Sequence, residues 1–313
     1  MTTHDELRYT RIPLTHGSGA LPAAGFGTLI PDPVVTKQAV KTALEAGFRH
    51  FDCAERYRNE QAVGEALQEM GKGGNIKRKD VFITTKLWNT NHRPERVTQA
   101  FEASRRRLQV DFIDCYIIHT PFAFRPGDEQ DPRDEHGQVL YDSGVTLVET
   151  WRAIEKLVDD GLCRSIGLSD VTLEKLQEIV AVARIKPAAV QVESHPYLPE
   201  WDLLKFCREQ GIVVQAFAPL GHAMAPKVID DPVITTIAQS IHKTPAQVAL
   251  AWAVQRGTAF LTTSTNPRRI QENFEISTLP EEAMRKISED IETRVRFNSV
   301  VGSGVPGFIP RSK

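Results

Sequence analysis

The chain has 313 residues, of which 41% are hydrophobic and 25% are charged, and its formal net charge is −2. This length fits one barrel or two small domains, and the composition is that of a globular protein with enough apolar residues for a core. The nearly neutral charge excludes a general attraction to nucleic acid or acidic membranes, so we expect neither as a partner.

The N-terminal residues and the cysteines indicate the compartment. Residues 1–6 lack the basic and apolar regions of a signal peptide, and no apolar run approaches the roughly 20 residues that span a bilayer. The four cysteines are widely spaced and form no C-x-x-C pair, which argues against a zinc site or a secreted disulfide framework. We therefore expect a cytoplasmic protein with the reduced, apolar cysteines Cys53, Cys115, Cys163 and Cys207.

The predicted elements begin with a β-hairpin at about residues 9–22, in which a strand over 9–14 and a second at 20–21 flank a glycine-rich turn. Helix-length segments with apolar residues at 3.6 spacing then alternate with short runs rich in β-branched residues. Prolines behind capping side chains at Asp231, Thr244 and Asn266 mark three helix starts. The eight strand-like runs are 23–27, 50–52, 81–84, 112–118, 165–168, 189–192, 212–216 and 259–262.

This alternation implies parallel strands joined by helical crossovers, either as a barrel or as an open doubly wound sheet. A dinucleotide-binding open sheet usually shows G-x-G-x-x-G after its first strand, and Gly25-Phe26-Gly27-Thr28 does not complete that pattern. We therefore predict an α/β fold, a single (β/α)8 TIM barrel over residues 1–313. The polar segment 124–143 is predicted to be a long substrate loop at the C-terminal face, and 294–313 an irregular tail.

Four polar residues lie at the C-terminal ends of predicted strands, where barrel enzymes carry their chemistry. They are Asp52, Tyr57, Lys86 and His119. Each alone has a structural alternative: a turn cap, a packed phenol, a solvated lysine and a core histidine. Together they can act as a proton donor. The Lys86 ammonium would stabilise the Tyr57 phenolate, the Asp52 carboxylate would hold that ammonium, and His119 would bind the substrate oxygen.

Several long motifs carry a family resemblance that extends over residues 12–295. They are Gly47-Phe48-Arg49-His50-Phe51-Asp52-Cys53-Ala54-Glu55-Arg56-Tyr57, Thr85-Lys86-Leu87-Trp88, Ile117-Ile118-His119-Thr120-Pro121, Ile166-Gly167-Leu168-Ser169-Asp170 and Gln191-Val192-Glu193-Ser194-His195-Pro196-Tyr197. In these motifs the chain resembles the aldo-keto reductase superfamily, in particular the aldose/aldehyde (xylose) reductase branch. The resemblance implies that Asp52, Tyr57, Lys86 and His119 are catalytic, with Tyr57 as the acid in the reduction of an aldehyde or ketone.

The resemblance also implies a nicotinamide dinucleotide at the barrel top. Read without the family, segment 262–269 already suits phosphate, because it combines hydroxyls, a helix N-terminus and two arginines. Asp170 stands where the family usually has Asn, and Thr263 where it has Lys. NADP(H) is therefore expected to be favoured and NAD(H) accepted. The implied cofactor residues are Gly27, Thr28, Asp52, Ser169, Asp170, Gln191, Phe217, Ala218, Leu220, Thr263, Ser264, Arg268, Arg269, Glu272 and Asn273.

The substrate is expected to be a small carbonyl compound, and an aldose or uronate is the more specific expectation. Such polar sugars need hydroxyl or cationic partners, for which Arg56, Arg93 and Arg125 are candidates in sequence. We expect a monomer or a weak homodimer. The expected substrate-binding residues are Leu29, Tyr57, Trp88, His119 and Phe122.

Three other functions remain open from the residues. A regulatory barrel protein that binds cofactor with little turnover would keep the same four residues. His50 and Asp52 superficially resemble a metal-ligand pair of a hydrolase, although no third clustered ligand appears and we expect no metal site. Lys86 would also suit a Schiff-base aldolase.

Overall fold

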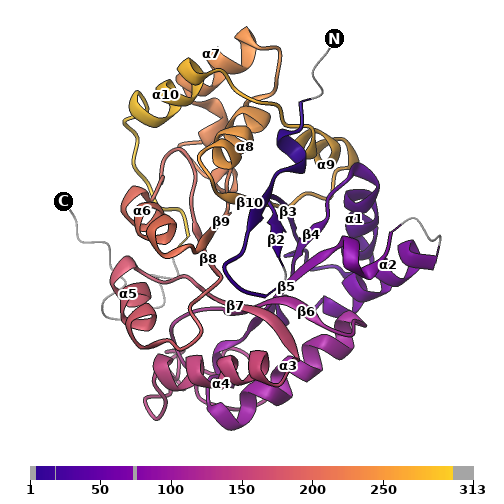
Figure 1. Cartoon of the computed structure of the whole chain (residues 1–313), viewed down its shortest axis with the longest axis vertical. Coiled ribbons are helices and arrows are strands. Elements are labelled where there is room, and N and C mark those ends of the chain that lie inside the picture. The colour runs from indigo at the N-terminus through magenta and orange to yellow at the C-terminus, as the bar shows by residue number, and fades with distance from the viewer. Residues whose placement is uncertain (1–4, 18, 73–75, 299–313) are drawn as a thin grey trace.

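The computed structural model describes residues 5–17, 19–72 and 76–298. Eight parallel strands close into a barrel in the order β10-β3-β4-β5-β6-β7-β8-β9, with helices around it (Figure 1). The (β/α)8 barrel is confirmed, and the open sheet is excluded. The barrel strands are β3 (Ala24–Gly27), β4 (His50–Asp52), β5 (Phe82–Leu87), β6 (Ile113–Ile118), β7 (Cys163–Ser169), β8 (Ala189–Glu193), β9 (Val213–Phe217) and β10 (Ala259–Thr262).

The strand bounds agree closely with the β-branched runs, with one difference that matters for the site. The β-branched run covers 81–84, and β5 continues to Leu87, which pairs with Ile118 of β6. Lys86 therefore lies within a strand, opposite Ile117, and its side chain is fixed by the barrel.

The helices follow the predicted starts and apolar stripes. The side chains of Asp231, Thr244 and Asn266 cap α7, α8 and α9 by accepting backbone N–H groups, as predicted. The helices are α1 (Pro33–Ala46), α2 (Glu60–Lys72), α3 (Pro94–Leu108), α4 (Leu147–Asp159), α5 (Leu173–Val182), α6 (Trp201–Gln210), α7 (Pro232–Ser240), α8 (Pro245–Gln255), α9 (Pro267–Phe274) and α10 (Glu281–Glu289). None of the described helices is long and apolar enough to cross a membrane.

The N-terminal hairpin closes the end of the barrel where the strands begin. Strands β1 (Arg11–Pro13) and β2 (Ala20–Pro22) pair antiparallel, which confirms the hairpin. The first strand was predicted from residue 9 but begins at Arg11, because Tyr9 ends a 3-10 turn over Leu7–Tyr9. Leu21 is fully buried and packs with Phe82 and Val213, the first residues of β5 and β9. The opposite end of the barrel, where the strands end, is not covered by this hairpin.

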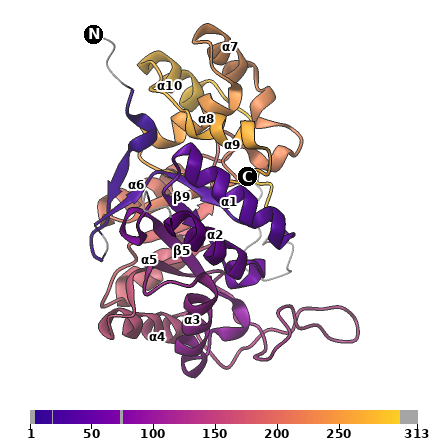
Figure 2. The ribbon, with the colours of Figure 1, turned by 90° about the vertical axis from the view of Figure 1, so that its right-hand side faces the viewer.

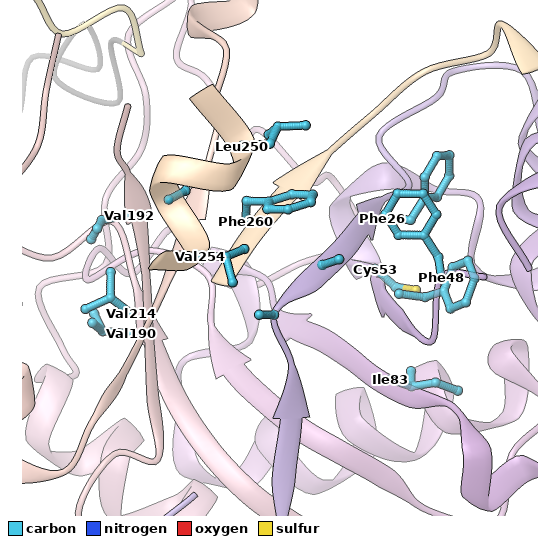
Figure 3. Packing of buried hydrophobic residues seen from close by; sticks show 14 of the residues in the cluster. Phe26, Phe48, Cys53, Ile83, Val190, Val192, Val214, Leu250, Val254 and Phe260 are labelled. Atoms are coloured by element: carbon cyan, nitrogen blue, oxygen red, sulfur yellow. The ribbon is translucent and has the colours of Figure 1, made fainter. Parts of the chain in front are cut away.

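The main core lies between the barrel strands and the surrounding helices. Phe26 of β3 packs edge-on against Phe48, with ring centroids 5.7 Å apart, and Figure 3 shows both rings beside Cys53. Val190 and Val214 belong to the same core and lie together at the left of Figure 3. All four cysteines are buried free thiols, as predicted.

The segment 124–143 is a long surface loop between β6 and α4, as predicted, and it projects from the molecule in Figure 2. Isolated antiparallel bridges join Phe124 to Tyr141 and Arg133 to Val139 within it. Of the predicted tail, residues up to Asn298 belong to the part that the structure describes, and Phe297 is buried. The rest of that tail, 299–313, lies outside the described residues.

Candidate active site

The structure brings the four predicted catalytic residues together. Asp52 ends β4, Lys86 lies in β5, His119 follows β6, and Tyr57 belongs to the 3-10 turn Glu55–Tyr57 after β4. The Lys86 Nζ atom lies 2.7 Å from Asp52 Oδ2 and 3.2 Å from the Tyr57 hydroxyl. The rings of Tyr57 and His119 meet edge to face, with centroids 5.8 Å apart. Four strand-end residues thus share one contact network.

Lys86 is held as a fully buried ammonium. Burial pushes the pKa of Lys86 down, but the charges of Asp52 and Tyr57 and their hydrogen bonds raise it overall. Lys86 Nζ also donates to the Cys53 carbonyl at 2.9 Å, so its three protons have three acceptors. A permanently protonated, enclosed ammonium does not act as the free amine that a Schiff-base aldolase needs.

The acidity of Tyr57 differs from our expectation. We expected the neighbouring ammonium to lower the phenol pKa, but burial outweighs Lys86 and raises the pKa of Tyr57 to about 12. The hydroxyl therefore carries its proton throughout the neutral pH range. The contribution of Lys86 is to oppose the cost of burial and to stabilise the phenolate left after proton transfer.

His119 is a neutral imidazole at the same site. Burial, followed by the charges of Lys86 and Arg56, holds the pKa of His119 well below its usual value. Its Nδ1 atom is buried without a hydrogen-bond partner among the described residues, and its ring packs against Trp88 at 5.1 Å between centroids. A neutral imidazole can orient a substrate oxygen by a hydrogen bond.

A cavity of about 790 Å³ opens above these residues. All five residues predicted to bind substrate line it, namely Leu29, Tyr57, Trp88, His119 and Phe122. Of the three candidate arginines only Arg56 lines it, and Arg56 pairs with Asp131 of the long loop. Arg93 pairs with Asp142 instead, and neither Arg93 nor Arg125 reaches the cavity.

A second cavity, of about 750 Å³, lies along the loops after β9 and β10. Its cationic groups are Arg269 and Lys227, and α9 begins beside it at Pro267. A cavity with cations and a helix N-terminus fits a phosphorylated dinucleotide. The predicted cofactor residues that line it are Ala218, Leu220, Thr263, Ser264, Arg269, Glu272 and Asn273.

Arg268 does not line this cavity. It was among the implied cofactor residues, but its side chain is 87% exposed and its Nε atom lies 2.7 Å from Glu272 on the surface of α9. Successive residues on a helix point about 100° apart, so Arg269 reaches the cavity and Arg268 does not. Thr263 lies close to β3. A Cβ atom on Gly27 would be only 2.5 Å from the Thr263 hydroxyl oxygen.

The other predicted cofactor residues lie at or next to the C-terminal ends of barrel strands. Gln191 is buried in β8, and its amide nitrogen donates to Asp52 Oδ1 at 2.8 Å and Gln215 Oε1 at 3.1 Å. This leaves the Gln191 carbonyl oxygen as the group to meet a ligand. Ser169 ends β7 and is buried, Phe217 ends β9, and Thr28 donates its hydroxyl to the Asp52 carbonyl.

Asp170 lines the substrate cavity rather than the cofactor-side cavity. Its backbone has a φ of 54°, a conformation that costs free energy in a residue other than glycine and that clusters at functional sites. Burial raises the pKa of Asp170 to about 7, against the opposing charge of Arg296. Near neutral pH this carboxyl therefore exists in both protonation states.

Sequence reasoning missed several cavity residues. Lys227 in the segment after β9 lines the cofactor-side cavity, while Arg133 and Asn298 line the substrate cavity. These residues lie in irregular segments, where periodicity says nothing about side-chain direction. The polar composition of loop 124–143 was the signal that pointed to Arg133.

His50 and Asp52, which superficially resemble a metal-ligand pair in the sequence, are both engaged by other groups of the barrel. The two ring nitrogens of His50 lie 3.2 Å from the Pro22 carbonyl and 3.0 Å from the Thr84 hydroxyl. Asp52 is engaged by Lys86. Among the described residues no group of three or more His, Cys, Asp or Glu side chains is placed to hold a metal ion.

A barrel with a tyrosine, lysine, aspartate and histidine gathered at its strand ends defines the class. The chain belongs to the Aldo/keto reductase family, whose family model matches residues 23–292. Members of this family are oxidoreductases that use nicotinamide cofactors, and general carbonyl reduction is the activity that the relatives support.

Individual relatives are similar over nearly the whole chain. The chain is 42% identical over 287 residues to Aldo-keto reductase family 1 member A1-A of Danio rerio, and the match covers 88% of each chain. It is 40% identical over 305 residues to Dihydrodiol dehydrogenase 3 of Bos taurus, covering 92% of this chain and 94% of the relative. The solved aldose reductase of Schistosoma japonicum superimposes with a TM-score of 0.89 at 38% identity, covering 96% and 99% of the two chains.

Proposed function

We propose that this protein reduces an aldehyde or ketone to the alcohol, with NADPH favoured and NADH accepted, and that Tyr57 donates the proton. The observation that carries the proposal is the Tyr57 hydroxyl, 3.2 Å from a buried ammonium and facing a cavity that His119 also lines. A protonated phenol beside a fixed positive charge is the arrangement that protonation of a developing alkoxide requires.

In the proposed reaction the four strand-end residues have different roles. A nicotinamide cofactor, which Ser264 and Arg269 would help to hold, would supply a hydride when bound. Tyr57 and His119 hold the carbonyl oxygen by hydrogen bonds, and Tyr57 gives up its proton as that oxygen becomes negative. A phenol with a pKa of about 12 is still a far stronger acid than an alcohol, so the transfer is downhill. Lys86 stabilises the phenolate, and Asp52 keeps Lys86 charged and in place.

The cofactor-side cavity supports the preference between the two dinucleotides. Ser264, Arg269 and Lys227 remain to meet phosphate groups, but Thr263 supplies no charge. The loss of one exposed phosphate contact weakens binding by about 1–2 kcal/mol, which reduces the preference for NADPH without abolishing it. We therefore expect kcat/KM for NADPH to exceed that for NADH by much less than several thousandfold.

The substrate cavity supports a polar, anionic carbonyl compound such as a uronate. Aromatic residues line it, and Arg133 of the long loop lines it as well. The Arg133 side chain is exposed, donates to the Gly137 carbonyl at 2.7 Å and forms no ion pair with a described residue. Arg56, in contrast, is neutralised by Asp131. Arg133 is thus the guanidinium that is available for a substrate carboxylate or hydroxyl.

The test is a turnover assay with D-glucuronate and D-glucose, which share a hexose skeleton and differ in charge, followed by the loss of reduced-nicotinamide absorbance. We expect turnover with both cofactors and a KM for glucuronate that rises about tenfold in Arg133→Ala. Arg125→Ala is the matched control, since Arg125 is exposed in the same loop but does not line the cavity. No turnover of any aldehyde would refute the proposed reaction, and an unchanged KM in Arg133→Ala would refute the role of Arg133.

A further inference from the structure

Gln191 of β8 and Gln215 of β9 lie side by side in the barrel and point into its interior. They are direct partners in the parallel register of the two strands. The residues before them, Val190 and Val214, belong to the core between the strands and the helices (Figure 3), and successive residues of a strand point to opposite faces. Gln191 is 3% exposed and Gln215 is 0% exposed, so their amides depend on partners inside the barrel.

A chain of hydrogen bonds that begins at Lys86 fixes the orientation of both amides. The Asp52 carboxylate is paired with the Lys86 ammonium and only accepts hydrogen bonds, so the Gln191 atom 2.8 Å from Asp52 Oδ1 is the nitrogen. The second N–H of Gln191 donates to Gln215 Oε1 at 3.1 Å. Because an amide group is planar, these two bonds also fix where the Gln191 oxygen points, and no described residue donates a hydrogen bond to that oxygen.

The amide nitrogen of Gln215 ends this chain without a partner. It is buried and has no hydrogen-bond partner among the described residues. An unpaired donor in a barrel interior costs free energy of folding, and an apolar side chain of similar length would avoid that cost. A polar group that is retained at such a cost beside a reaction site calls for a role at its other end. That other end is the oxygen that holds Gln191.

The surroundings of Gln191 indicate what its free oxygen meets. Its amide is bonded to Asp52, which holds Lys86 beside the Tyr57 hydroxyl. A nicotinamide ring that reacts at this hydroxyl has one hydrogen-bonding substituent, a carboxamide, whose NH2 group is the complement of an amide oxygen. We propose that Gln215 is a positioning residue, which holds the Gln191 amide so that its oxygen receives the carboxamide. This inference rests on the proposed reductase function.

Two variants of Gln215 separate the acceptor from the unpaired donor. Gln215→Met keeps the length of the side chain and removes both the oxygen and the nitrogen. Gln215→Glu keeps an oxygen for Gln191, and its carboxyl stays protonated because it is buried beside the Asp52 carboxylate. We therefore expect the methionine variant to lose the positioning effect and the glutamate variant to retain it.

The measurement is the Kd of three ligands, followed by quenching of intrinsic fluorescence. They are NADP⁺, its 3-acetylpyridine analogue, in which a methyl group replaces the amide nitrogen, and adenosine 2′,5′-bisphosphate, which has no nicotinamide. We expect the native chain to bind NADP⁺ about fivefold more tightly than the analogue, because the analogue has no N–H for Gln191. This ratio should fall below about twofold in Gln215→Met and stay at about fivefold in Gln215→Glu. The Kd of the bisphosphate should change by less than about twofold in every variant.

Gln255→Met is the matched control. Gln255 lies in α8, where its amide donates to the Leu279 carbonyl at 3.1 Å and accepts the Leu279 N–H at 2.6 Å. It lines neither cavity. This variant makes the same substitution and also removes amide hydrogen bonds, so it should lower Tm but leave the ratio of NADP⁺ to analogue at its native value.

The outcomes separate the role of Gln215 from the reductase function. If the native chain binds neither dinucleotide, the proposed function fails and the role of Gln215 fails with it. If NADP⁺ binds but no aldehyde is reduced, the proposed function fails alone, and the ratio of the two Kd values still decides the role of Gln215.

Three results would overturn the positioning role. They are a native ratio near one, a native ratio retained in Gln215→Met, and a ratio lost in Gln215→Glu to the same extent as in Gln215→Met. Gln215→Leu also lacks an acceptor, and it replaces Gln215→Met in this comparison if the methionine variant does not fold. A lower Tm with an unchanged ratio would show that Gln215 is structural only.

Discussion

The Nζ atom of Lys86 lies 2.7 Å from Oδ2 of Asp52, with the two side chains 0% and 5% exposed. The other oxygen of Asp52 accepts the amide of Gln191 at 2.8 Å, and Lys86 also donates to the Cys53 carbonyl. A buried ion pair persists only where its remaining donors and acceptors are satisfied in this way. The pair is therefore part of the barrel's structure as well as of its chemistry.

Breaking this ion pair is expected to destabilise the protein strongly. Asp52→Asn leaves the Lys86 charge buried without its counter-charge, and such single removals cost about 3–5 kcal/mol in the free energy of unfolding. Urea unfolding at pH 7 measures the loss. The double variant Asp52→Leu/Lys86→Met removes both charges and should recover most of the stability, whereas a double variant as unstable as the sum of the single ones would show that the two residues do not interact.

Tyr57→Phe is expected to fold and bind cofactor but to lose activity. Removal of a general acid lowers kcat by about a hundredfold or more, while the packing of the ring is retained. Single-turnover reduction measures the loss, and quenching of intrinsic fluorescence measures cofactor binding.

Tyr116→Phe is the control for this prediction. Tyr116 lies in β6, fully buried, and its hydroxyl has no hydrogen-bond partner among the described residues. Removal of that unpaired hydroxyl should leave turnover unchanged and stability equal or slightly higher. Native turnover in Tyr57→Phe would eliminate Tyr57 as the proton donor.

Arg269 and Arg268 are expected to differ in their effect on cofactor binding. Arg269→Ala should weaken NADPH binding by about 1–2 kcal/mol, roughly tenfold in Kd, because its guanidinium lines the cavity where phosphate groups would lie. Arg268→Ala should leave the Kd for NADPH unchanged, since Arg268 pairs with Glu272 at the surface. The reverse order of effects would place the phosphate on the other side of α9.

The barrel and the gathering of Asp52, Tyr57, Lys86 and His119 at one end of it could be predicted because local patterns specify them. The run at 50–52 and the run at 259–262 coincide with β4 and β10, since their apolar residues are buried strand residues. Asp52, Lys86 and His119 come together because parallel strands present their C-terminal ends at one face. These residues are far apart in the sequence, but the topology of the barrel fixes their positions relative to one another.

The features that were missed depend on long-range packing. The choice between Arg268 and Arg269 is a matter of helix rotation, which the motif does not specify. The raised pKa of Tyr57 comes from burial by segments that sequence does not place. The hydrogen bond from the Phe297 backbone N–H to the Glu193 carboxylate joins residues more than a hundred positions apart, and nothing local to either segment indicates it.

Asp170 is expected to make stability depend on pH in the neutral range. Its pKa is raised from 3.8 to about 7, chiefly by burial, while Arg296 and Lys86 oppose the rise and Glu193 adds to it. A carboxyl with a raised folded-state pKa contributes its full stability below the unfolded pKa, and that contribution is lost as pH rises toward the folded value. The native chain should therefore lose stability between about pH 4 and pH 7 through this group.

Asp170→Asn removes this titration and suits the backbone, because asparagine tolerates the positive φ of 54° at this position. Its gain in urea midpoint over the native chain should grow from pH 5 to pH 7 and then stay constant. Asp142→Asn is a control of opposite sign, since the hydrogen bond from Arg93 lowers the pKa of Asp142, and this variant should lose stability by an amount that is constant above pH 5. A pH-independent difference between Asp170→Asn and the native chain would show that Asp170 titrates near its ordinary value.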